Sequence, residues 1–351
     1  MIDPEILDRD AKIAEIDKQG MLERVSSFPA MLEEGIKLGA VPAEGLKPTD
    51  RTFICGMGGS AICGDIISDA FSSVLDSKIE VIRGYKLPRS ARRGDLACAV
   101  SYSGNTEETL SCVDDAEKRG LKILAVSSGG KLSEIAGQRK YPLISIPQGV
   151  QPRAALPYFL SSILVAFERI GLIVDTSTEL KESVKVLKGL REEYLKERRT
   201  NPVKHLAQKI YDKVPLIYSS DHISSAARRM AAQLNENGKI IAHSAVFPEL
   251  NHNELVGLSD LKRGGHSFAL IILRDEGDLE RTKKRIEITK SLIGASLGGV
   301  SEVTSSGKGK LARLLSLIFF GDLLSVYVAL LRGVDPTPVE IIEKLKRELS
   351  R

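Results

Sequence analysis

Cysteine is scarce in this sequence, which has only four among 351 residues: Cys55, Cys63, Cys98 and Cys112. None belongs to a C-x-x-C pair and no histidine lies nearby at zinc-ligand spacing, so the common zinc motifs are excluded. Cys55 and Cys98 fall in apolar runs, as is typical of buried, reduced thiols. Reduced thiols, together with an acidic N-terminus (MIDPEILDRDAK) that lacks a signal-peptide core, predict a cytoplasmic protein.

Excess charge and membrane-length apolar runs are also nearly absent. The net charge of +4 is too small, on a chain of this length, to form the basic stripe that nucleic-acid binding requires. One apolar run, residues 314–331, is long enough to span a membrane, but Asp322 lies at its centre, where a charge in lipid is costly. We therefore expect a buried helix, and neither a nucleic-acid nor a membrane partner.

Apolar runs of strand length alternate with helical periods along most of the chain. The predicted strands are the runs at 51–55, 78–85, 95–103, 121–128, 141–147, 214–220, 266–275 and 300–306. This alternation is typical of βαβ units, and it predicts an α/β protein with parallel sheets flanked by helices, plus terminal helices. The length favours two domains. The predicted boundaries are an N-terminal helical segment at 1–48, a first sheet domain at 49–165, a helical linker at 166–204, a second sheet domain at 205–332 and a C-terminal helix at 333–351.

Two loops in the first domain have the composition of an anion site. GMGGS (56–60) and SYSGNT (101–106) each follow a predicted strand and precede a predicted helix. Ligands of open α/β sheets bind at such strand ends, where glycines admit an anion and a helix N-terminus offers N–H groups. Neither loop is a P-loop or a G-x-G-x-x-G motif. The alternative is that the hydroxyls only cap helices, with Asn105 and Glu108 forming a capping box. Because two such loops occur in one sheet, we favour a phosphate cradle.

These residues resemble the sugar isomerase (SIS) domain family, in which Gly-Gly-Ser is followed by Ser-x-Ser-Gly-x-Thr. The further motifs QPRAALPY, QLNENGK, FPELNHNELVG and VDPTPVEIIEKLK resemble those of the bifunctional phosphoglucose/phosphomannose isomerases of archaea. The resemblance covers roughly residues 52–345. It implies two doubly wound, flavodoxin-like SIS domains, a homodimer with a site near the subunit interface, and no metal or organic cofactor. The implied substrates are fructose 6-phosphate, glucose 6-phosphate and mannose 6-phosphate.

The resemblance also assigns roles to individual residues. Phosphate binding is implied for Gly59, Ser60, Ser101, Ser103 and Thr106. Catalytic roles are implied for Arg153, Glu236, His252 and Lys344. For Thr337 the resemblance implies a position in the wall of the sugar pocket.

The residue types suit an aldose–ketose isomerisation through a cis-enediol(ate). A carboxylate such as Glu236 can carry a proton between C1 and C2, and the guanidinium of Arg153 can stabilise the enediolate charge. Each residue also has a non-functional alternative. Glu236 could be a solvated acid in a helix-terminal loop, and Arg153 could be a surface arginine at the start of a helix.

Ring opening needs a proton shuttle, and a histidine titrates in the appropriate range. His252 lies in a polar cluster, and the resemblance suggests that it reaches into the partner's site with Lys344 assisting; a structural role is the alternative. A small Thr337 is consistent with a sugar that rotates about C2–C3, although Thr337 could also cap the last helix.

Three other functions stay open at this point. A phosphosugar-binding regulator would need a DNA-binding helix-turn-helix, for which residues 1–48 are short and acidic. An isomerase linked to amide transfer would need a nucleophilic cysteine domain. An isomerase of a single sugar phosphate is the third.

Overall fold

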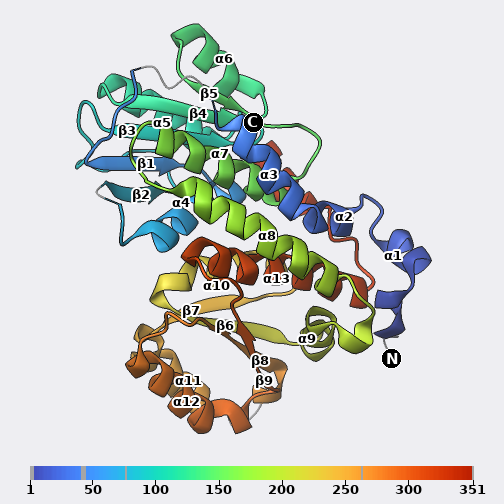
Figure 1. Cartoon of the computed structure of the whole chain (residues 1–351). Helices are drawn as coiled ribbons and strands as arrows, with labels where there is room; N and C mark the ends of the chain where they lie inside the picture. Colours follow the sequence, from blue (N-terminus) through green and yellow to red (C-terminus); the bar gives the residue numbers. More distant parts are fainter. Residues whose placement is uncertain (1–3, 41–44, 76, 262–263, 350–351) are drawn as a thin grey trace. The chain divides into compact units, whose positions relative to one another are not determined.

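The computed structural model describes residues 4–40, 45–75, 77–261 and 264–349. Its chain forms two compact units, each built on one parallel sheet (Figure 1). The first-sheet unit comprises Ser27–Lys188 and Gly307–Leu315, and the second-sheet unit comprises Met1–Ser26, Gly189–Ser306 and Ser316–Arg351. Residues 41–44 of the expected N-terminal segment lie outside the described residues, and the domain boundaries drawn from the sequence stay a prediction.

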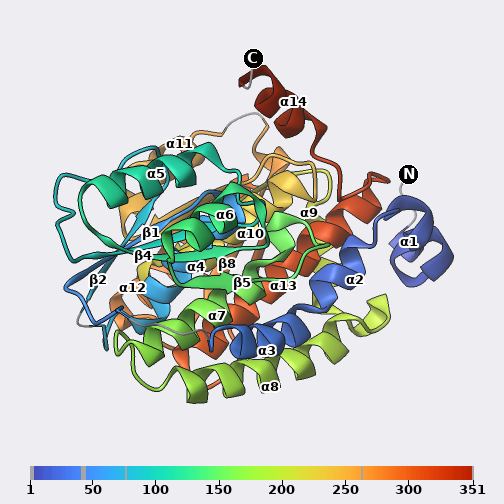
Figure 2. The same cartoon turned by 90° about the horizontal axis from the view of Figure 1, so that it is seen from above.

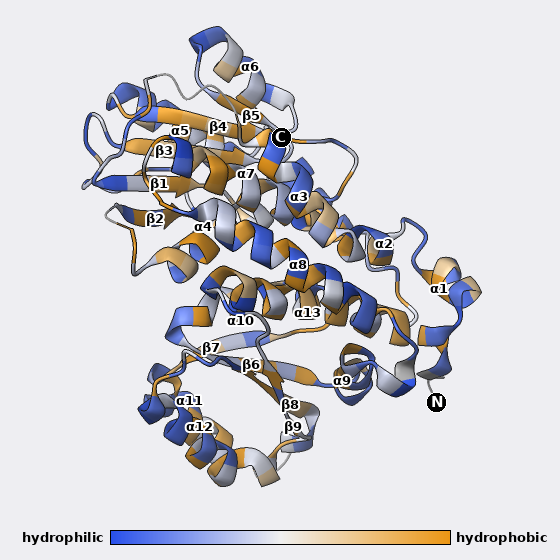
Figure 3. Cartoon of the chain, in the orientation of Figure 1, coloured by the Kyte–Doolittle hydropathy of each residue, from blue (hydrophilic) through white to orange (hydrophobic). Residues whose placement is uncertain are grey.

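Five parallel strands form the first sheet in the order β2-β1-β3-β4-β5. This is the flavodoxin-like doubly wound order, so the predicted fold class is confirmed. Every strand lies within a predicted apolar run, and the central strand β3 and its neighbour β4 are largely orange in Figure 3. The bounds are β1 Arg51–Cys55, β2 Lys78–Ile82, β3 Leu96–Ser101, β4 Lys122–Ser127 and β5 Leu143–Ser145.

Helices cover both faces of this sheet because alternate strand residues point to opposite sides. Phe53 and Cys55 of β1 pack in one cluster with buried residues of α5 and α6, whereas Ile54 faces Gly64 of α4. Helix α6 was not predicted, since its ten residues include two glycines. The helical elements are α3 Phe28–Leu38, α4 Gly58–Phe71, α5 Glu107–Lys118, α6 Gly130–Arg139, η2 Pro152–Ala154, α7 Leu156–Arg169 and α8 Thr176–Tyr194.

The second sheet repeats this topology with four parallel strands in the order β7-β6-β8-β9. Strands β6 Val214–Ser220, β8 Phe268–Arg274 and β9 Val300–Thr304 agree with predicted runs. Strand β7 His243–Phe247 was not predicted: it is an edge strand, only its last residue is buried, and its sequence starts with two polar residues.

Helices α11 and α12 lie on one face of the second sheet and α10 on the other (Figure 1). The helical elements of this unit are η1 Pro4–Asp8, α1 Asp10–Ile16, α2 Met21–Ser26, η3 Arg198–Thr200, α9 Pro202–Ile210, η4 Asp221–Ile223, α10 Ser224–Glu236, η5 Glu249–His252, α11 Glu254–Ser259, η6 Gly265–Ser267, α12 Glu280–Ile293, η7 Gly294–Ser296, most of α13 Lys310–Leu331, and α14 Glu340–Leu349. In Figure 2, α14 projects at the C-terminal end of the chain, and all its residues are exposed.

Helix α13 corresponds to the long apolar run of the sequence. It is the one helix among the described residues that is long and apolar enough to cross a membrane, and its apolar window is completely buried. The expectation of a buried helix is therefore confirmed. The four cysteines are likewise free and buried, as predicted.

Candidate active site

The two glycine- and serine-containing loops leave one edge of the first sheet from neighbouring strands. Strands β1 and β3 pair in parallel, with Cys55 opposite Ala99. Helix α4 begins at Gly58, three residues earlier than predicted, so Gly58, Gly59 and Ser60 form its first turn. The first turn of a helix directs backbone N–H groups outward at its positive end. The first loop therefore has the geometry of an anion site.

Arg153 lies directly behind this first turn. A Cβ atom added to Gly59 would lie 3.0 Å from the carbonyl oxygen of Pro152 and 3.1 Å from the Cα of Arg153, so only glycine fits here without displacing the backbone of η2. Arg153 is only 5% exposed, and the alternative of a surface arginine is therefore wrong. A guanidinium stays charged when buried, so Arg153 brings a fixed positive charge to this edge of the sheet.

The second loop is held by its own hydroxyl groups. The Ser101 and Thr106 hydroxyls form a hydrogen bond of 2.9 Å, and the Asn105 N–H donates to Ser103 Oγ at 3.2 Å. The predicted Asn105–Glu108 capping box is wrong: α5 starts one residue later, with Thr106 at the N-cap, and Asn105 Oδ1 accepts a hydrogen bond from the Lys131 N–H at 3.1 Å. The Asn105 side chain thus joins two loops rather than capping a helix.

Lys131 belongs to a third polar segment, Ser-Ser-Gly-Gly-Lys at 127–131, which runs from the end of β4 into α6 and was missed in the sequence. Ser128 Oγ donates to the Tyr102 carbonyl at 2.7 Å. Gly104 has a left-handed φ of 67°, and a Cβ there would lie 1.8 Å from the Gly129 carbonyl oxygen. Small polar residues directly after an apolar strand were the available signal, the same one that identified the first two loops.

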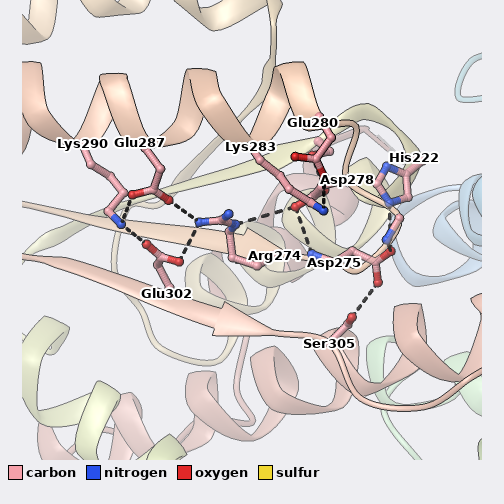
Figure 4. A network of polar contacts seen from close by, with 12 residues as sticks. His222, Arg274, Asp275, Asp278, Glu280, Lys283, Glu287, Lys290, Glu302 and Ser305 are labelled. Atoms are coloured by element: carbon pink, nitrogen blue, oxygen red, sulfur yellow. Dashed lines mark hydrogen bonds and ion pairs between the residues drawn. The ribbon is translucent and has the colours of Figure 1, made fainter.

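The corresponding edge of the second sheet is filled by carboxylates of the protein itself (Figure 4). Ser220 Oγ donates to Asp278 Oδ1 at 2.5 Å, and Ser305 Oγ donates to Asp275 Oδ1 at 2.5 Å. His222 Nε2 lies 3.0 Å from Asp275 Oδ2. Both aspartates are 4% exposed. Since these hydroxyls already bind buried carboxylates, the edge of the first sheet is the better candidate for the predicted phosphate cradle.

Glu236 is the last residue of α10 and is half-buried. It lines a cavity of about 470 Å³ together with Asn235, Lys239 and apolar residues that include Val339 and Ile341. Asn235 Nδ2 donates to the Ala231 carbonyl at 2.7 Å. This hydrogen bond holds the end of α10 and does not involve the Glu236 carboxylate. A carboxyl group beside an apolar wall is a suitable place for proton transfer.

Thr337 is 5% exposed and lies near this cavity, between Pro336 and Pro338. Its N–H donates to Asp335 Oδ1 at 2.9 Å, which closes a tight turn. Helix α14 begins only at Glu340, so the alternative that Thr337 is the N-cap of that helix is wrong.

His252 and Lys344 are exposed, His252 at the end of η5 and Lys344 on α14. The neighbouring Glu254 is engaged by the Tyr218 hydroxyl at 2.7 Å and by His243 at 3.2 Å. Burial, followed by this bond, raises the pKa of Tyr218 far above its usual value. Within the described ranges, no group of three or more histidine, cysteine or acidic side chains has the geometry to hold a metal ion.

The predicted site residues therefore form two groups. Gly59, Ser60, Ser101, Ser103, Thr106 and Arg153 come together in the first-sheet unit. In the second-sheet unit, Glu236 and Thr337 lie near one cavity, and His252 and Lys344 are exposed on other elements. The roles of these ten residues stay predictions.

Comparisons with known proteins bear on the family and the fold of the chain. Residues 199–349 match the family model described as bacterial phospho-glucose isomerase C-terminal SIS domain. The bifunctional phosphoglucose/phosphomannose isomerase of Caldicellulosiruptor bescii is 41% identical over 94% of this chain and 99% of its own. The D-glucosamine-6-phosphate 4-epimerase of Sulfolobus acidocaldarius is 32% identical over 86% of this chain and 90% of its own.

A solved structure has the same fold. The glucose-6-phosphate isomerase like protein of Thermus thermophilus has a TM-score of 0.65 and 19% identity, and the match covers 97% of this chain and 98% of that one. Sequence identity above 40% over nearly the full length, together with the SIS match, settles the family. The chain belongs to the bifunctional phosphoglucose/phosphomannose isomerase family of SIS-domain proteins.

Proposed function

We propose that the chain is an aldose–ketose isomerase that interconverts fructose 6-phosphate with both glucose 6-phosphate and mannose 6-phosphate. The observation that carries the proposal is the edge of the first sheet. Two loops with hydroxyls and helix-terminal N–H groups follow neighbouring strands there, and the first of them adjoins the buried Arg153. Membership of the family supplies the substrate class.

The loops would hold the phosphate without a lysine. Ser60, Ser101, Ser103 and Thr106 supply hydroxyl donors, and the first turn of α4 supplies backbone N–H groups. Hydrogen bonds to a charged group are about twice as strong as neutral ones, so several together can bind a phosphate dianion. This binding orients the sugar carbons, which do not react with the loops themselves.

Glu236 would act as the base. In the direction from ketose to aldose, its carboxylate removes a proton from C1, the C2 carbonyl becomes an enediolate oxygen, and Arg153 stabilises that negative charge. The carboxyl group then returns a proton to C2, the hydroxyl proton of the C1 oxygen passes to the C2 oxygen, and the C1 oxygen becomes the aldehyde carbonyl. Delivery to either face of C2 gives glucose or mannose phosphate, and the small Thr337 leaves room for the sugar to turn. No metal or organic cofactor is needed for this sequence.

His252 and Lys344 would assist ring opening in the site of a partner subunit. Their exposure supports a homodimer with a site near the subunit interface, and α14 adds a second argument. Ile341 is 75% exposed, Leu345 is 59% exposed and Leu349 is 64% exposed. An apolar stripe at this helical spacing is typical of a face that packs on another surface. We place the dimer in the cytoplasm, because the thiols are free and buried.

A second candidate is epimerisation at C4 of an amino-sugar phosphate, because one relative with that name is 32% identical. A phosphosugar-binding regulator is not favoured, since the relative of highest identity named above is an enzyme.

Product analysis tests the proposal. The purified protein is incubated with fructose 6-phosphate and EDTA, and the products are resolved by chromatography. We expect both glucose 6-phosphate and mannose 6-phosphate. Glucose 6-phosphate alone would contradict the bifunctional activity and the role of Thr337. No conversion, together with epimerisation of glucosamine 6-phosphate, would favour the second candidate.

A further inference from the structure

Lys239 connects the end of the helix that carries Glu236 with the turn that carries Thr337. Its ammonium group donates to the Glu236 carbonyl at 2.6 Å and to the carbonyls of Pro336 and Pro338 at 3.3 and 2.5 Å. A lysine ammonium has three N–H donors, and these three carbonyls match them in number. Two of the carbonyls directly flank Thr337.

The backbone of Lys239 supports a specific role. Lys239 has a φ of 53°, in the left-handed region that side chains other than glycine and asparagine seldom adopt. Glycine is the usual residue at such a helix end. A lysine that keeps this conformation is a reason to look for a function of its side chain.

The end of α10, where Lys239 makes its first hydrogen bond, is also fixed to α13. Asn237 is fully buried, and its Nδ2 donates to Ser325 Oγ of α13 at 3.0 Å. The Thr337 turn has the local Asp335 hydrogen bond, but that bond does not connect it to α10. The hydrogen bonds of Lys239 do join the two segments, and Lys239 lines the same cavity as Glu236.

We propose that Lys239 is a positioning residue that fixes the distance between Glu236 and Thr337, and thereby controls both turnover and the ratio of glucose to mannose phosphate. This proposal rests on the proposed function. The ammonium does not take a proton from the sugar; it acts through the three carbonyls. If the Thr337 turn moves away from Glu236, the sugar is misaligned with the base and its rotation about C2–C3 is less restricted.

The test compares three variants. Lys239→Asn removes the ammonium but tolerates a left-handed backbone, whereas Lys239→Arg keeps a cation with several donors. Lys284→Asn, at an exposed position of α12, is the matched control. For Lys239→Asn we expect kcat to fall by about 10- to 100-fold, as small misplacements of substrate do. The KM for fructose 6-phosphate should change little, and the product ratio should shift. Arginine should restore part of kcat, and Lys284→Asn should behave as wild type.

Hydrogen–deuterium exchange gives a readout that does not depend on activity. In Lys239→Asn, a peptide that covers 333–342 should exchange faster, while peptides from α12 should not change. An unchanged exchange rate in 333–342, or an unchanged kcat and product ratio, would overturn the positioning role. A wild-type protein that forms neither aldose phosphate would overturn the proposed function instead, and the exchange experiment would still decide whether Lys239 holds the turn.

Discussion

Arg229 and Asp322 form a two-point ion pair inside the second-sheet unit. Arg229 Nε lies 2.9 Å from Asp322 Oδ1, and Arg229 Nη2 lies 2.6 Å from Asp322 Oδ2. The two side chains are 3% and 2% exposed. Burial raises the pKa of Asp322, and the attraction of Arg229 opposes that rise. The pair joins α10 to α13, seven residues before the proposed base at the end of α10.

Breaking this pair should destabilise the protein strongly. In Asp322→Ala, Arg229 becomes a buried charge without its carboxylate, and such losses cost about 3–5 kcal/mol. We expect a clearly lower midpoint of thermal unfolding and a lower kcat, because the end of α10 is less firmly held. Differential scanning calorimetry and steady-state kinetics measure the two effects.

An exposed pair serves as the control for that variant. Glu280 and Lys283 form an ion pair on α12 in which Glu280 is 88% exposed, and exposed pairs contribute at most about 1 kcal/mol. Glu280→Ala should therefore unfold almost as wild type does. An Asp322→Ala protein as stable as Glu280→Ala would show that the buried pair does not hold α10.

The phosphate loops should act on binding more than on chemistry. In Ser103→Ala/Thr106→Ala, two hydroxyl donors to the phosphate are lost, at about 1.5–3 kcal/mol for each bond to a charged group. Loss of both should raise the KM for fructose 6-phosphate by at least about 100-fold, with a smaller effect on kcat. Ser145→Ala, at an exposed position of β5 in the same sheet, is the control. A defect confined to kcat would argue against a phosphate cradle.

His252 should be needed for turnover only when the substrate must open its ring. His252→Ala should slow turnover of fructose 6-phosphate, which must open its ring, by about 10²-fold or more, the range of general acid–base catalysis. It should leave turnover of 5-deoxyfructose 6-phosphate nearly unchanged, because that ketose lacks the hydroxyl that closes the ring. His205→Ala, at an exposed position of α9, is the control. Equal losses on both substrates would remove the ring-opening role.

Because of Cys63, the free energy of unfolding should fall as the pH rises in the alkaline range. Burial, with a smaller contribution from Asp65, raises the pKa of this thiol to about 12 in the folded chain, against about 8.5 when unfolded. Below pH ~8.5 both states carry the proton, so stability is unaffected. Between about pH 9 and 12 the unfolded state loses the proton first, and the free energy of unfolding falls by up to ~1.4 kcal/mol per pH unit.

Denaturant titrations between about pH 8 and about pH 10.5 measure that slope. Cys63→Ala should lose stability with pH less steeply than wild type, because it lacks this one thiol. Equal slopes in the two proteins would contradict the assignment.

The sequence predicted the parts of the fold that depend on local pattern. Strand β6, Val214–Ser220, agrees with the predicted run residue for residue, because a strand buried on both faces is continuously apolar. Strand β7 escaped prediction because an edge strand with one buried residue has no such run. The same contrast holds in the site: the loops at 56–60 and 101–106 are local patterns, and they do meet at one edge of the sheet.

Features that depend on distant packing could not be predicted. Arg153 is buried because η2 packs against Gly59, almost a hundred residues earlier in the chain. Lys239 reaches the carbonyl of Pro336, which lies 97 positions further along. Asn105 has the spacing of a capping residue, yet its side chain accepts a hydrogen bond from a loop on the next strand. In each case, the partner is set by the tertiary fold rather than by neighbouring residues.

The most direct test of the account is the Glu236→Gln variant with fructose 6-phosphate in heavy water. Glutamine keeps the size of the side chain and cannot accept the proton. Formation of both aldose phosphates, with deuterium at their C2, and deuterium exchange at C1 of the recovered fructose 6-phosphate should therefore fall together by about 10²- to 10⁴-fold. Thermal unfolding and phosphate affinity should stay close to wild type. Near-normal formation of either aldose phosphate by this variant would contradict Glu236 as the base.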